Sequence, residues 1–376
     1  MKQASFFFII VCLVADAAAF KFLSNFKASS LIPRPSNMLK SRRAAKKFGT
    51  KKLAVITDAS SGLGLKTAAE LLRTGEYHVF GATNDLEKMR LAAKDEDFSD
   101  DDFTPLEIDL GSFESVRSFC KDLQKTKLNR PIDRMICNAA VYHPGETPEW
   151  SADGHEQTVQ VNFFSHFLMV SLMLPDLVRA SDPRVILLGS ASPKEGVGVY
   201  PRADLCALEG LKAGAANPIS MLDGYNYNGA KAYKDSKLSL SMLSSMLHSR
   251  YARQTGIAFS TAFPGLIEDD ELFAGKPPLD VSNGLPGLST GLVKSLAEAE
   301  LNVLQGLGLG DGLTMDGIGE ETHSVKIDEA AQRILQVRAS SSLCPLGLAT
   351  RPPPSSPAQG SRASSLASSL ASVPVF

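Results

Sequence analysis

Hydrophobic residues between positions 53 and 264 follow two alternating patterns. Short apolar runs of strand length alternate with stretches in which apolar residues recur every three or four positions, as on one face of a helix. The runs predict strands at 53–57, 78–82, 104–110, 134–139, 184–189 and 257–263. The periodic stretches predict helices at 63–73, 86–93, 113–125, 155–179 and 229–253, with another at 327–337. This alternation predicts an α/β fold in a single domain, with a doubly wound parallel sheet covered by helices on both faces.

The predicted domain covers residues 51–337, and two regions depart from its pattern. The loop at 191–228 is longer than connections in compact domains usually are, which predicts that it is functional or partly structured. Residues 338–376 consist largely of Ser, Ala and Pro with few charges, a low-complexity composition that buries too little apolar area to offset chain entropy. We therefore expect a disordered tail there.

The first fifty residues resemble a targeting segment rather than part of the fold. Residues 6–14 are apolar but too few to span a membrane, and alanines at 17–19 complete the layout of a signal peptide over residues 1–19. Residues 20–50 are rich in Lys, Arg and Ser and contain no acidic residue, as in transit peptides. Together they resemble the bipartite presequences of algae with complex plastids. They predict a plastid (chloroplast) location, with residues 1 to about 50 removed or disordered in the mature protein.

Simple secretion is the alternative interpretation of this N-terminal segment. A secreted protein has no use for a basic, acid-free stretch, and it would more often carry disulfides. The five cysteines lie far apart without a C-x-x-C pair, which argues against a disulfide framework and against a zinc site. We therefore favour plastid import and expect no metal.

The charge of the chain restricts its partners. The formal net charge is −2 and the basic residues are scattered, which indicates no surface for nucleic acid. After the presequence no apolar stretch is long enough to predict a transmembrane helix, so any contact with thylakoid membranes is expected to be peripheral.

A glycine-rich turn follows the first predicted strand and leads directly into a helix. Glycine lets backbone N–H groups approach a pyrophosphate, and the N-terminus of the following helix favours negative charge. Two glycines also fit a tight turn without a ligand, so the turn alone does not decide between these interpretations. The residues of the turn expected to contact a dinucleotide are Thr57, Ser60, Ser61, Gly62, Leu63 and Gly64.

The ends of the next three strands supply further residues for a dinucleotide. Asn84 and Lys88 follow the second strand, where the adenosine ribose is expected, and a basic residue there accepts the 2′-phosphate of NADP. A lone lysine at the start of a helix is more often just a solvated residue, which leaves the choice between NAD and NADP open. The third and fourth strands end in further candidates for cofactor contact, Asp109, Leu110, Asn138 and Ala139.

The motif Tyr233-Lys234-Asp235-Ser236-Lys237 lies near the start of the long fifth helix. Tyr233 and Lys237 are four residues apart and share one helix face. A neighbouring ammonium group lowers the pKa of a phenol, so Tyr233 becomes able to transfer a proton near neutral pH. Such pairs also arise by chance on amphipathic helices. Ser190-Ala191-Ser192 follows the fifth strand, and a hydroxyl there can share the reacting oxygen or orient the tyrosine. Asn162 can hold a water that reloads the relay through Lys237.

Taken together, these motifs resemble those of the short-chain dehydrogenase/reductase family in order and spacing. They are the glycine-rich turn, Asn138-Ala139-Ala140, Asn162, the serines Ser190 and Ser192, Tyr233 with Lys237, and Pro264-Gly265. The resemblance covers residues 51–337 and implies a Rossmann-type cofactor site. It implies Tyr233, Lys237, Ser192 and Asn162 as the catalytic set, and it adds Pro264 and Gly265 to the cofactor contacts.

Within this family, several segments resemble the light-dependent protochlorophyllide oxidoreductases. They are residues 59–65, 138–142, 152–154, 218–224, 229–237, 248–251 and 255–257, and the loop at 191–228 resembles an insertion of these enzymes. The resemblance implies light-driven reduction of a ring double bond of protochlorophyllide, with hydride from NADPH and a proton through Tyr233. It also implies that Lys237 orients the cofactor ribose and that Ser192 occupies the hydroxyl position. A homo-oligomer is compatible with it.

Three residues depart from the pattern of these enzymes. Asp58 replaces the first glycine of the turn and brings a carboxylate close to two phosphates, although Asp tolerates unusual backbone torsions and caps helices well. Asn84 stands where the family carries an arginine for the 2′-phosphate, and Leu266 where it carries a cysteine near the substrate. Two alternatives therefore stay open. One is a dark-active carbonyl or retinol-type reductase, and the other is a non-catalytic relative that binds pigment or nucleotide.

Overall fold

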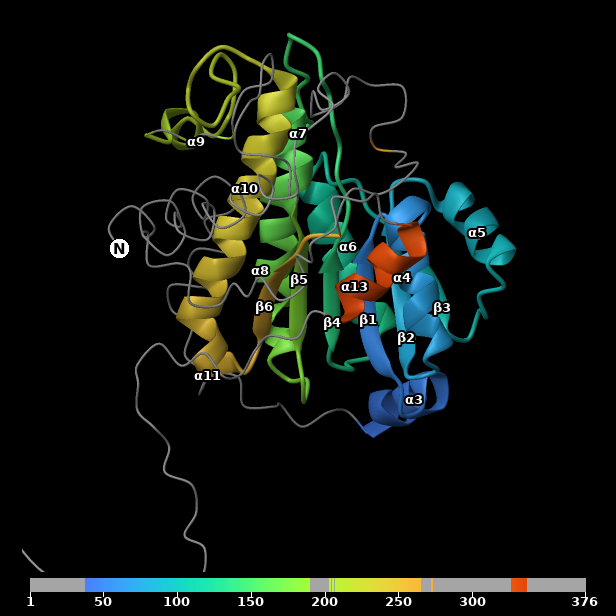
Figure 1. The fold of residues 1–376 in the computed structure, drawn as a ribbon. Helices are drawn as coiled ribbons and strands as arrows, with labels where there is room; N and C mark the ends of the chain where they lie inside the picture. Colours follow the sequence, from blue (N-terminus) through green and yellow to red (C-terminus); the bar gives the residue numbers. More distant parts are fainter. Residues whose placement is uncertain are drawn as a thin grey trace, which may run out of the picture. The chain divides into compact units, whose positions relative to one another are not determined.

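The computed structural model of the chain describes residues 38–189, 207–264 and 326–336, with residues 203, 205 and 272, and side chains from residue 43 onward. Six parallel strands form one sheet in the order β3-β2-β1-β4-β5-β6, which confirms the predicted doubly wound fold (Figure 1). The strands are β1 (Lys52–Thr57), β2 (Tyr77–Thr83), β3 (Phe103–Glu107), β4 (Arg134–Cys137), β5 (Arg184–Leu188) and β6 (Ala258–Ala262). The strand order reverses between β1 and β4, where ligands bind in folds of this kind.

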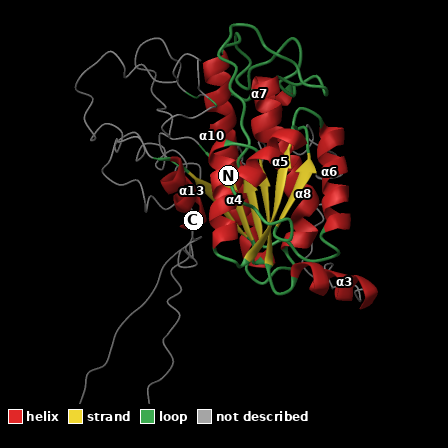
Figure 2. Cartoon of the chain, turned by 90° about the vertical axis from the view of Figure 1, so that its right-hand side faces the viewer, coloured by secondary structure: helices red, strands yellow, loops and turns green. Residues whose placement is uncertain are grey.

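Helices cover both faces of the sheet (Figure 2). One layer contains α4 (Gly62–Arg73), α5 (Leu86–Asp95) and α13 (Ile327–Gln336), and the other contains α6 (Phe113–Thr126), α8 (Ser165–Leu177) and α10 (Gly229–Leu247). Alternate residues of each strand serve the two layers: Leu53 and Val55 pack on the α8 side, and Ala54 and Ile56 on the α4 side. A strand buried on both faces has a continuous apolar sequence, which is the pattern that predicted it.

Two of the predicted helices contain π-helical turns. The segment predicted at 155–179 consists of α7 (Gln157–Val159), η2 (Gln160–Phe164) and α8. After η2 the N–H of Ser165 donates to the carbonyl of Gln160, five residues back. The segment predicted at 229–253 continues from α10 through η3 (His248–Ala252) to α11 (Arg253–Thr255). The apolar period predicts helix in both places but does not distinguish the wider turn.

The helix α3 (Met38–Phe48) lies in the segment that composition assigns to a presequence. Its last turns are packed: Ala44 and Phe48 are buried, and the Phe48 ring lies 4.8 Å from that of His78 on β2. Arg130 donates to the backbone carbonyls of Gly49 and Lys51 at 2.9 and 2.6 Å. The prediction that residues up to about 50 form no packed element is therefore wrong for residues 44–48. The partners of Phe48 lie about thirty residues further along the chain, so local composition could not reveal them.

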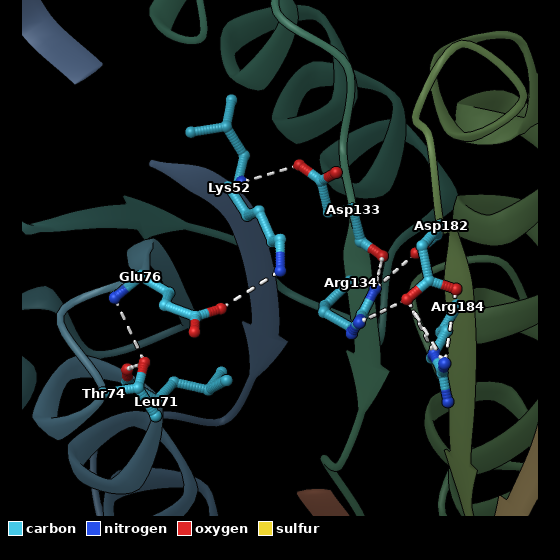
Figure 3. Close-up of polar contacts among 9 residues, drawn as sticks. Lys52, Leu71, Thr74, Glu76, Asp133, Arg134, Asp182 and Arg184 are labelled. Carbon is cyan, nitrogen blue, oxygen red and sulfur yellow. Dashed lines mark hydrogen bonds and ion pairs between the residues drawn. The ribbon is translucent and has the colours of Figure 1, made fainter. Parts of the chain in front are cut away.

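Charged side chains join the amino ends of the strands, at the edge of the sheet shown in Figure 3. Arg134 forms an ion pair with Asp182 at 2.9 Å, and Lys52 forms one with Glu76 at 3.1 Å. Asp133 accepts a hydrogen bond from the N–H of Leu53 at 2.9 Å. Partly exposed pairs of this kind add little to stability, and the charged side chains of these two pairs bind one another. The candidate functional residues lie at the opposite edge.

Among the described residues, one helical stretch, Gln157–Leu177, is long and apolar enough to cross a membrane by length and composition. Of its apolar window, 89 % is buried inside the fold. The stretch contains α8, which packs against α6 and β4, and its apolar character therefore reflects a core helix. The predicted signal peptide at 1–19 and the predicted tail at 338–376 lie outside the described residues.

Candidate active site

The hydroxyl of Thr57 joins the carboxyl ends of β1 and β4. The side chain is buried, and its Oγ1 accepts the backbone N–H groups of Asn138 and Ala139, each at 2.9 Å. Asn138 in turn donates through Nδ2 to the carbonyls of Thr57 and Asp58 at 3.0 and 3.3 Å. These bonds explain why β4 ends at Cys137, two residues earlier than predicted, because the next N–H groups turn to Thr57 instead of a neighbouring strand.

The glycine-rich turn is closed tightly around its own backbone. A Cβ on Gly64 would lie 1.9 Å from the carbonyl oxygen of Asp58, so only glycine fits there. Gly62 and Asp58 both have positive φ angles, 51° and 56°. Asp58 accepts a hydrogen bond from the hydroxyl of Ser60 at 3.2 Å, and Ser60 accepts one from Thr83 at the end of β2 at 3.3 Å. The turn thus connects the ends of β1 and β2.

The first turn of α4 is suited to an anion. Ser61 is its N-cap residue and makes no side-chain capping bond. By contrast α5, α6 and α10 are capped by the side chains of Asp85, Ser112 and Asn228. The unbonded N–H groups of a helix N-terminus attract phosphate through hydrogen bonds and the helix dipole. The turn and helix therefore fit the pyrophosphate of a dinucleotide, with Ser61, Gly62 and Leu63 around it.

The predicted adenosine side of the site is polar and open. Asn84 and Lys88 are exposed beyond the end of β2, and the N–H of Lys88 donates to Asp85 at 2.9 Å. Asp109 is exposed and accepts from the N–H of Gly111 at 2.7 Å. Leu110 is buried, and its carbonyl accepts the hydroxyl of Ser165 at 2.6 Å. Lys88 thus remains a cation that a 2′-phosphate could reach, whereas the side chain of Leu110 belongs to the core.

Tyr233 and Lys237 lie side by side on α10 at the end of β5. Both are almost fully buried, and the Lys237 Nζ lies 5.6 Å from the centre of the Tyr233 ring. Lys237 donates to the carbonyl of Leu188, the last residue of β5, at 3.0 Å. On its other side Tyr233 meets the ring of Tyr142 edge-on at 5.5 Å. The predicted pair is therefore brought to the sheet edge, with the ammonium held close to the phenol.

Asn162 lies in the π-helical turn and faces the same helix. Its side chain is buried; Oδ1 accepts from the N–H of Val141 at 2.8 Å, and Nδ2 donates to the carbonyl of Val141 and to Ser236 Oγ, both at 3.0 Å. Both amide hydrogens are therefore used by protein groups. A role in holding a water for Lys237 stays a prediction.

Of the remaining positions that the sequence analysis singled out, the structure describes Pro264. Pro264 follows β6 and is partly buried at the described end of that segment. Ser192, Gly265 and the divergent Leu266 lie outside the described residues.

His166 is a residue of this site that the sequence did not single out. It is fully buried on α8, with Nε2 3.1 Å from Thr57 Oγ1 and Nδ1 3.0 Å from the carbonyl of Asn162. Burial lowers its pKa to about 4, so the imidazole is neutral. A lone histidine in an apolar helix gives no signal by itself, although its position one turn after Asn162 places it on the same helix face.

The long insertion is partly structured where it is described, and buried polar contacts anchor it. Lys231 on α10 pairs with Asp223 at 2.8 Å and with Asp235 at 2.5 Å. Burial alone would lower the pKa of Lys231, but the two carboxylates outweigh it and raise the pKa above its usual value. Tyr227 donates to the buried Glu156 at 3.2 Å, and burial raises the pKa of that carboxyl. The end of the insertion is thus held to Lys231 in the first turns of α10 and to Glu156 before α7.

Comparison with known proteins agrees with this fold. The family model for short chain dehydrogenases matches residues 52–202. The chain is 42 % identical over 238 residues to the chloroplastic protochlorophyllide reductase of Marchantia paleacea, covering 61 % of this chain and 52 % of that protein. It is 43 % identical over 237 residues to that of Chlamydomonas reinhardtii, covering 61 % and 59 %. It is 38 % identical over 288 residues to protochlorophyllide reductase A of Hordeum vulgare, covering 71 % and 74 %.

These matches, together with the fold, identify the chain as a short-chain dehydrogenase. It belongs to the short-chain dehydrogenase family, and its relatives named above are the chloroplastic protochlorophyllide reductases within it. The match spans between one half and three fifths of the length of the Marchantia and Chlamydomonas proteins.

Proposed function

We propose that this protein is a light-dependent NADPH:protochlorophyllide oxidoreductase that forms chlorophyllide in chlorophyll biosynthesis. The observation that carries the proposal is the buried Tyr233/Lys237 pair, with Lys237 Nζ 3.0 Å from the carbonyl that ends β5 and 5.6 Å from the phenol ring. The protochlorophyllide reductases to which the chain is similar supply the substrate class. The segments at 218–224 and 229–237, which suggested this substrate, carry the buried ion pairs of Lys231.

Bound NADPH supplies a hydride, with its two electrons, to one carbon of the pigment double bond. Tyr233 donates a proton to the neighbouring carbon, so the double bond becomes a single bond and NADP⁺ is left. Lys237 favours the phenolate that results, because a nearby ammonium stabilises it, and the phenol is then reprotonated from solvent. Tyr142 packs against the ring of Tyr233 and limits its rotation.

The cofactor site follows from the turn and the strand ends. Ser61, Gly62 and Leu63 would hold the pyrophosphate at the N-terminus of α4, where Ser61 makes no side-chain capping bond. Lys88 supports the choice of NADPH over NADH through the 2′-phosphate, in place of the arginine absent at Asn84. Asn138 and Ala139, whose backbone N–H groups donate to Thr57 at the end of β4, would contact the bound cofactor.

The proposed site of action is the plastid, in an alga whose plastid lies inside extra membranes. The chloroplastic relatives and the presequence composition of the first residues support it. Contact with the thylakoid is proposed to be peripheral. Assembly into a homo-oligomer is part of the same proposal.

Flash absorbance spectroscopy of the purified protein with protochlorophyllide and NADPH tests this function. The wild type is expected to convert the pigment spectrum to that of chlorophyllide after a flash and to leave it unchanged in the dark. Tyr233→Phe keeps the ring and its packing on Tyr142 but removes the ionisable hydroxyl. It should bind NADPH and pigment normally and lose about a hundredfold or more in product formation.

Lys237→Ala is the companion variant, and it should fail differently. Lysine is assigned both to the cofactor ribose and to the phenol, so this variant should weaken NADPH binding as well as turnover. Product formation by Tyr233→Phe at the parent rate would exclude Tyr233 as proton donor. Reduction of retinal or another carbonyl in the dark, without pigment conversion in the light, would favour the carbonyl reductase instead.

A further inference from the structure

A continuous chain of buried polar groups runs beneath the candidate active site. Thr57, His166, Asn162 and Ser236 are each fully buried. They belong to β1, α8, η2 and α10, so the chain crosses from the cofactor turn to the helix of Tyr233. Buried polar side chains that satisfy one another fix a particular arrangement of the elements that carry them.

The hydrogen atoms of this chain can be assigned from its partners alone. The carbonyl of Asn162 can only accept, so the Nδ1 of His166, 3.0 Å away, carries the proton. The neutral ring then accepts at Nε2, and the Thr57 hydroxyl donates to it across 3.1 Å. The oxygen of Thr57 has two lone pairs left, and these accept the N–H groups of Asn138 and Ala139. Every group at this end of the chain is therefore satisfied in a single tautomer.

The other end of the chain reaches the helix that carries the catalytic pair. Asn162 Nδ2 donates to Ser236 Oγ at 3.0 Å, and Ser236 Oγ donates to the carbonyl of Tyr233 at 2.7 Å. Ser236 lies directly before Lys237 in the sequence. His166 is thus the side chain that links Thr57 to Asn162, beside the bonds that Asn162 makes to the backbone of Val141 after β4.

We propose that His166 is a positioning residue that couples the seating of NADPH at the ends of β1 and β4 to the placement of Tyr233 and Lys237 for proton transfer. The turnover part of this inference rests on the proposed function, whereas the link to NADPH binding stands on the geometry of the cofactor turn. His166 is itself fully buried. It acts through Thr57 on one side and Asn162 on the other.

The chain contains a matched control for a merely structural histidine. His78 on β2 is also fully buried; its Nδ1 bonds the carbonyl of Asp101 and its Nε2 the hydroxyl of Thr104, each at 2.9 Å. It lies near the amino end of the sheet, away from the cofactor turn. His78→Leu and His166→Leu therefore remove the same pair of bonds from the same kind of site.

Both leucine variants should unfold at lower urea concentration than the wild type, since each leaves buried polar partners unsatisfied. Only His166→Leu should also weaken NADPH binding, by about tenfold in a fluorescence titration without pigment. At saturating NADPH, where the weaker binding no longer matters, His166→Leu should still lower light-driven turnover by about tenfold, with little change in pigment KM. His78→Leu should keep the wild-type NADPH affinity, light-driven turnover and pigment KM.

Two conservative variants separate the two hydrogen bonds of His166, one to Thr57 and one to the carbonyl of Asn162. They also keep the inference testable if the leucine variant does not fold. The amide of His166→Gln reaches the position of Nε2 and keeps the bond to Thr57, so NADPH affinity should survive while turnover falls. The amide of His166→Asn lies near the position of Nδ1 and keeps the bond to Asn162. This variant should lose NADPH affinity and retain turnover at saturating cofactor.

Hydrogen exchange gives a readout that does not depend on pigment reduction. NADPH should slow exchange of the amides of residues 229–237 in the wild type and in His78→Leu but not in His166→Leu. If the wild type binds NADPH without reducing pigment, the proposed function fails while the titrations and exchange still decide the role of His166. Equal NADPH affinity and equal protection in the two leucine variants would overturn the inference.

Discussion

Asp58 is the residue at which this chain departs most clearly from a glycine-rich phosphate turn, and its backbone explains how the departure is tolerated. Its φ angle is 56°, in the left-handed region that glycine adopts freely and that Asp tolerates better than most residues. The carboxylate is not simply directed at a phosphate, since it accepts a hydrogen bond from Ser60. Its negative charge nevertheless lies beside the N-terminus of α4, where the pyrophosphate is expected.

Replacing Asp58 by glycine should tighten NADPH binding by about threefold to tenfold, because it removes a negative charge near two phosphates. Asp58→Asn is the control, because it removes the charge and keeps a side chain that tolerates positive φ. Titration of all three proteins at equal salt measures the effect. If charge is the cause, the Asn and Gly variants bind alike; unchanged or weaker binding in both would mean that the carboxylate points away from the phosphates.

At the scale of elements, the sequence predicted the strands and helices, which depend on the local spacing of apolar residues. It missed the features that depend on contacts between residues distant in sequence. All six strands, and their arrangement in one parallel sheet, follow from apolar runs between amphipathic stretches. The bond from Ser165 back to Gln160 adds one residue to a turn without changing the apolar pattern. The sequence therefore could not predict the π-helical turn η2. Within the site, Tyr233 and Lys237 were found because their spacing is local. His166 was not predicted, because its place in the site depends on a hydrogen bond to Thr57, which is distant in sequence and belongs to β1.

The contact between α10 and the insertion gives a second prediction at this scale. Lys231→Met leaves the carboxylates of Asp223 and Asp235 buried without their cation, which should lower the free energy of unfolding by about 3–5 kcal/mol. Lys212→Met is the matched control, because Lys212 pairs with Glu209 in the same insertion but both are exposed. That change should cost at most about 1 kcal/mol. Urea unfolding measures both, and equal losses would show that the buried triad does not anchor the insertion.

At the scale of the whole molecule, two neutral histidines buried near opposite edges of the sheet make stability depend on pH. Burial lowers the pKa of His78 and of His166 to about 4, whereas an unfolded histidine titrates near 6.5. Between these values the unfolded chain binds more protons than the folded one. Their contribution to stability is therefore fully present above about pH 6.5 and is lost as pH falls toward 4.

The urea midpoint of the wild type should therefore fall when the pH is lowered from 7 to 5. His78→Leu should be less stable at pH 7 but should show a smaller further loss at pH 5, with a difference on the order of 1–3 kcal/mol. Chemical denaturation at several pH values measures this. An unchanged pH dependence in the variant would assign the acid sensitivity to other groups.

The packing of α3 bears on where the predicted presequence would end. Phe48 is buried against the rings of His78 and Phe80, at 4.8 and 6.1 Å, and Ala44 is also buried. Deleting a buried phenylalanine ring typically costs about 3–5 kcal/mol. Removal of all residues to about 50, as composition alone suggested, would therefore strip a core side chain from the domain.

We predict that import cleaves the chain before residue 43, so that the mature protein keeps the packed turns of α3. N-terminal sequencing of the protein recovered from plastids measures the cleavage position. A chain that begins at residue 38 should match the stability of the full-length protein, whereas one that begins at residue 51 should lose about as much stability as Phe48→Ala. Residues 1–37 fused to a fluorescent reporter should suffice for plastid import in an alga with a complex plastid. Secretion of that reporter would refute the targeting interpretation, and a mature chain that starts after Phe48 would show that the contacts of α3 are dispensable in the plastid.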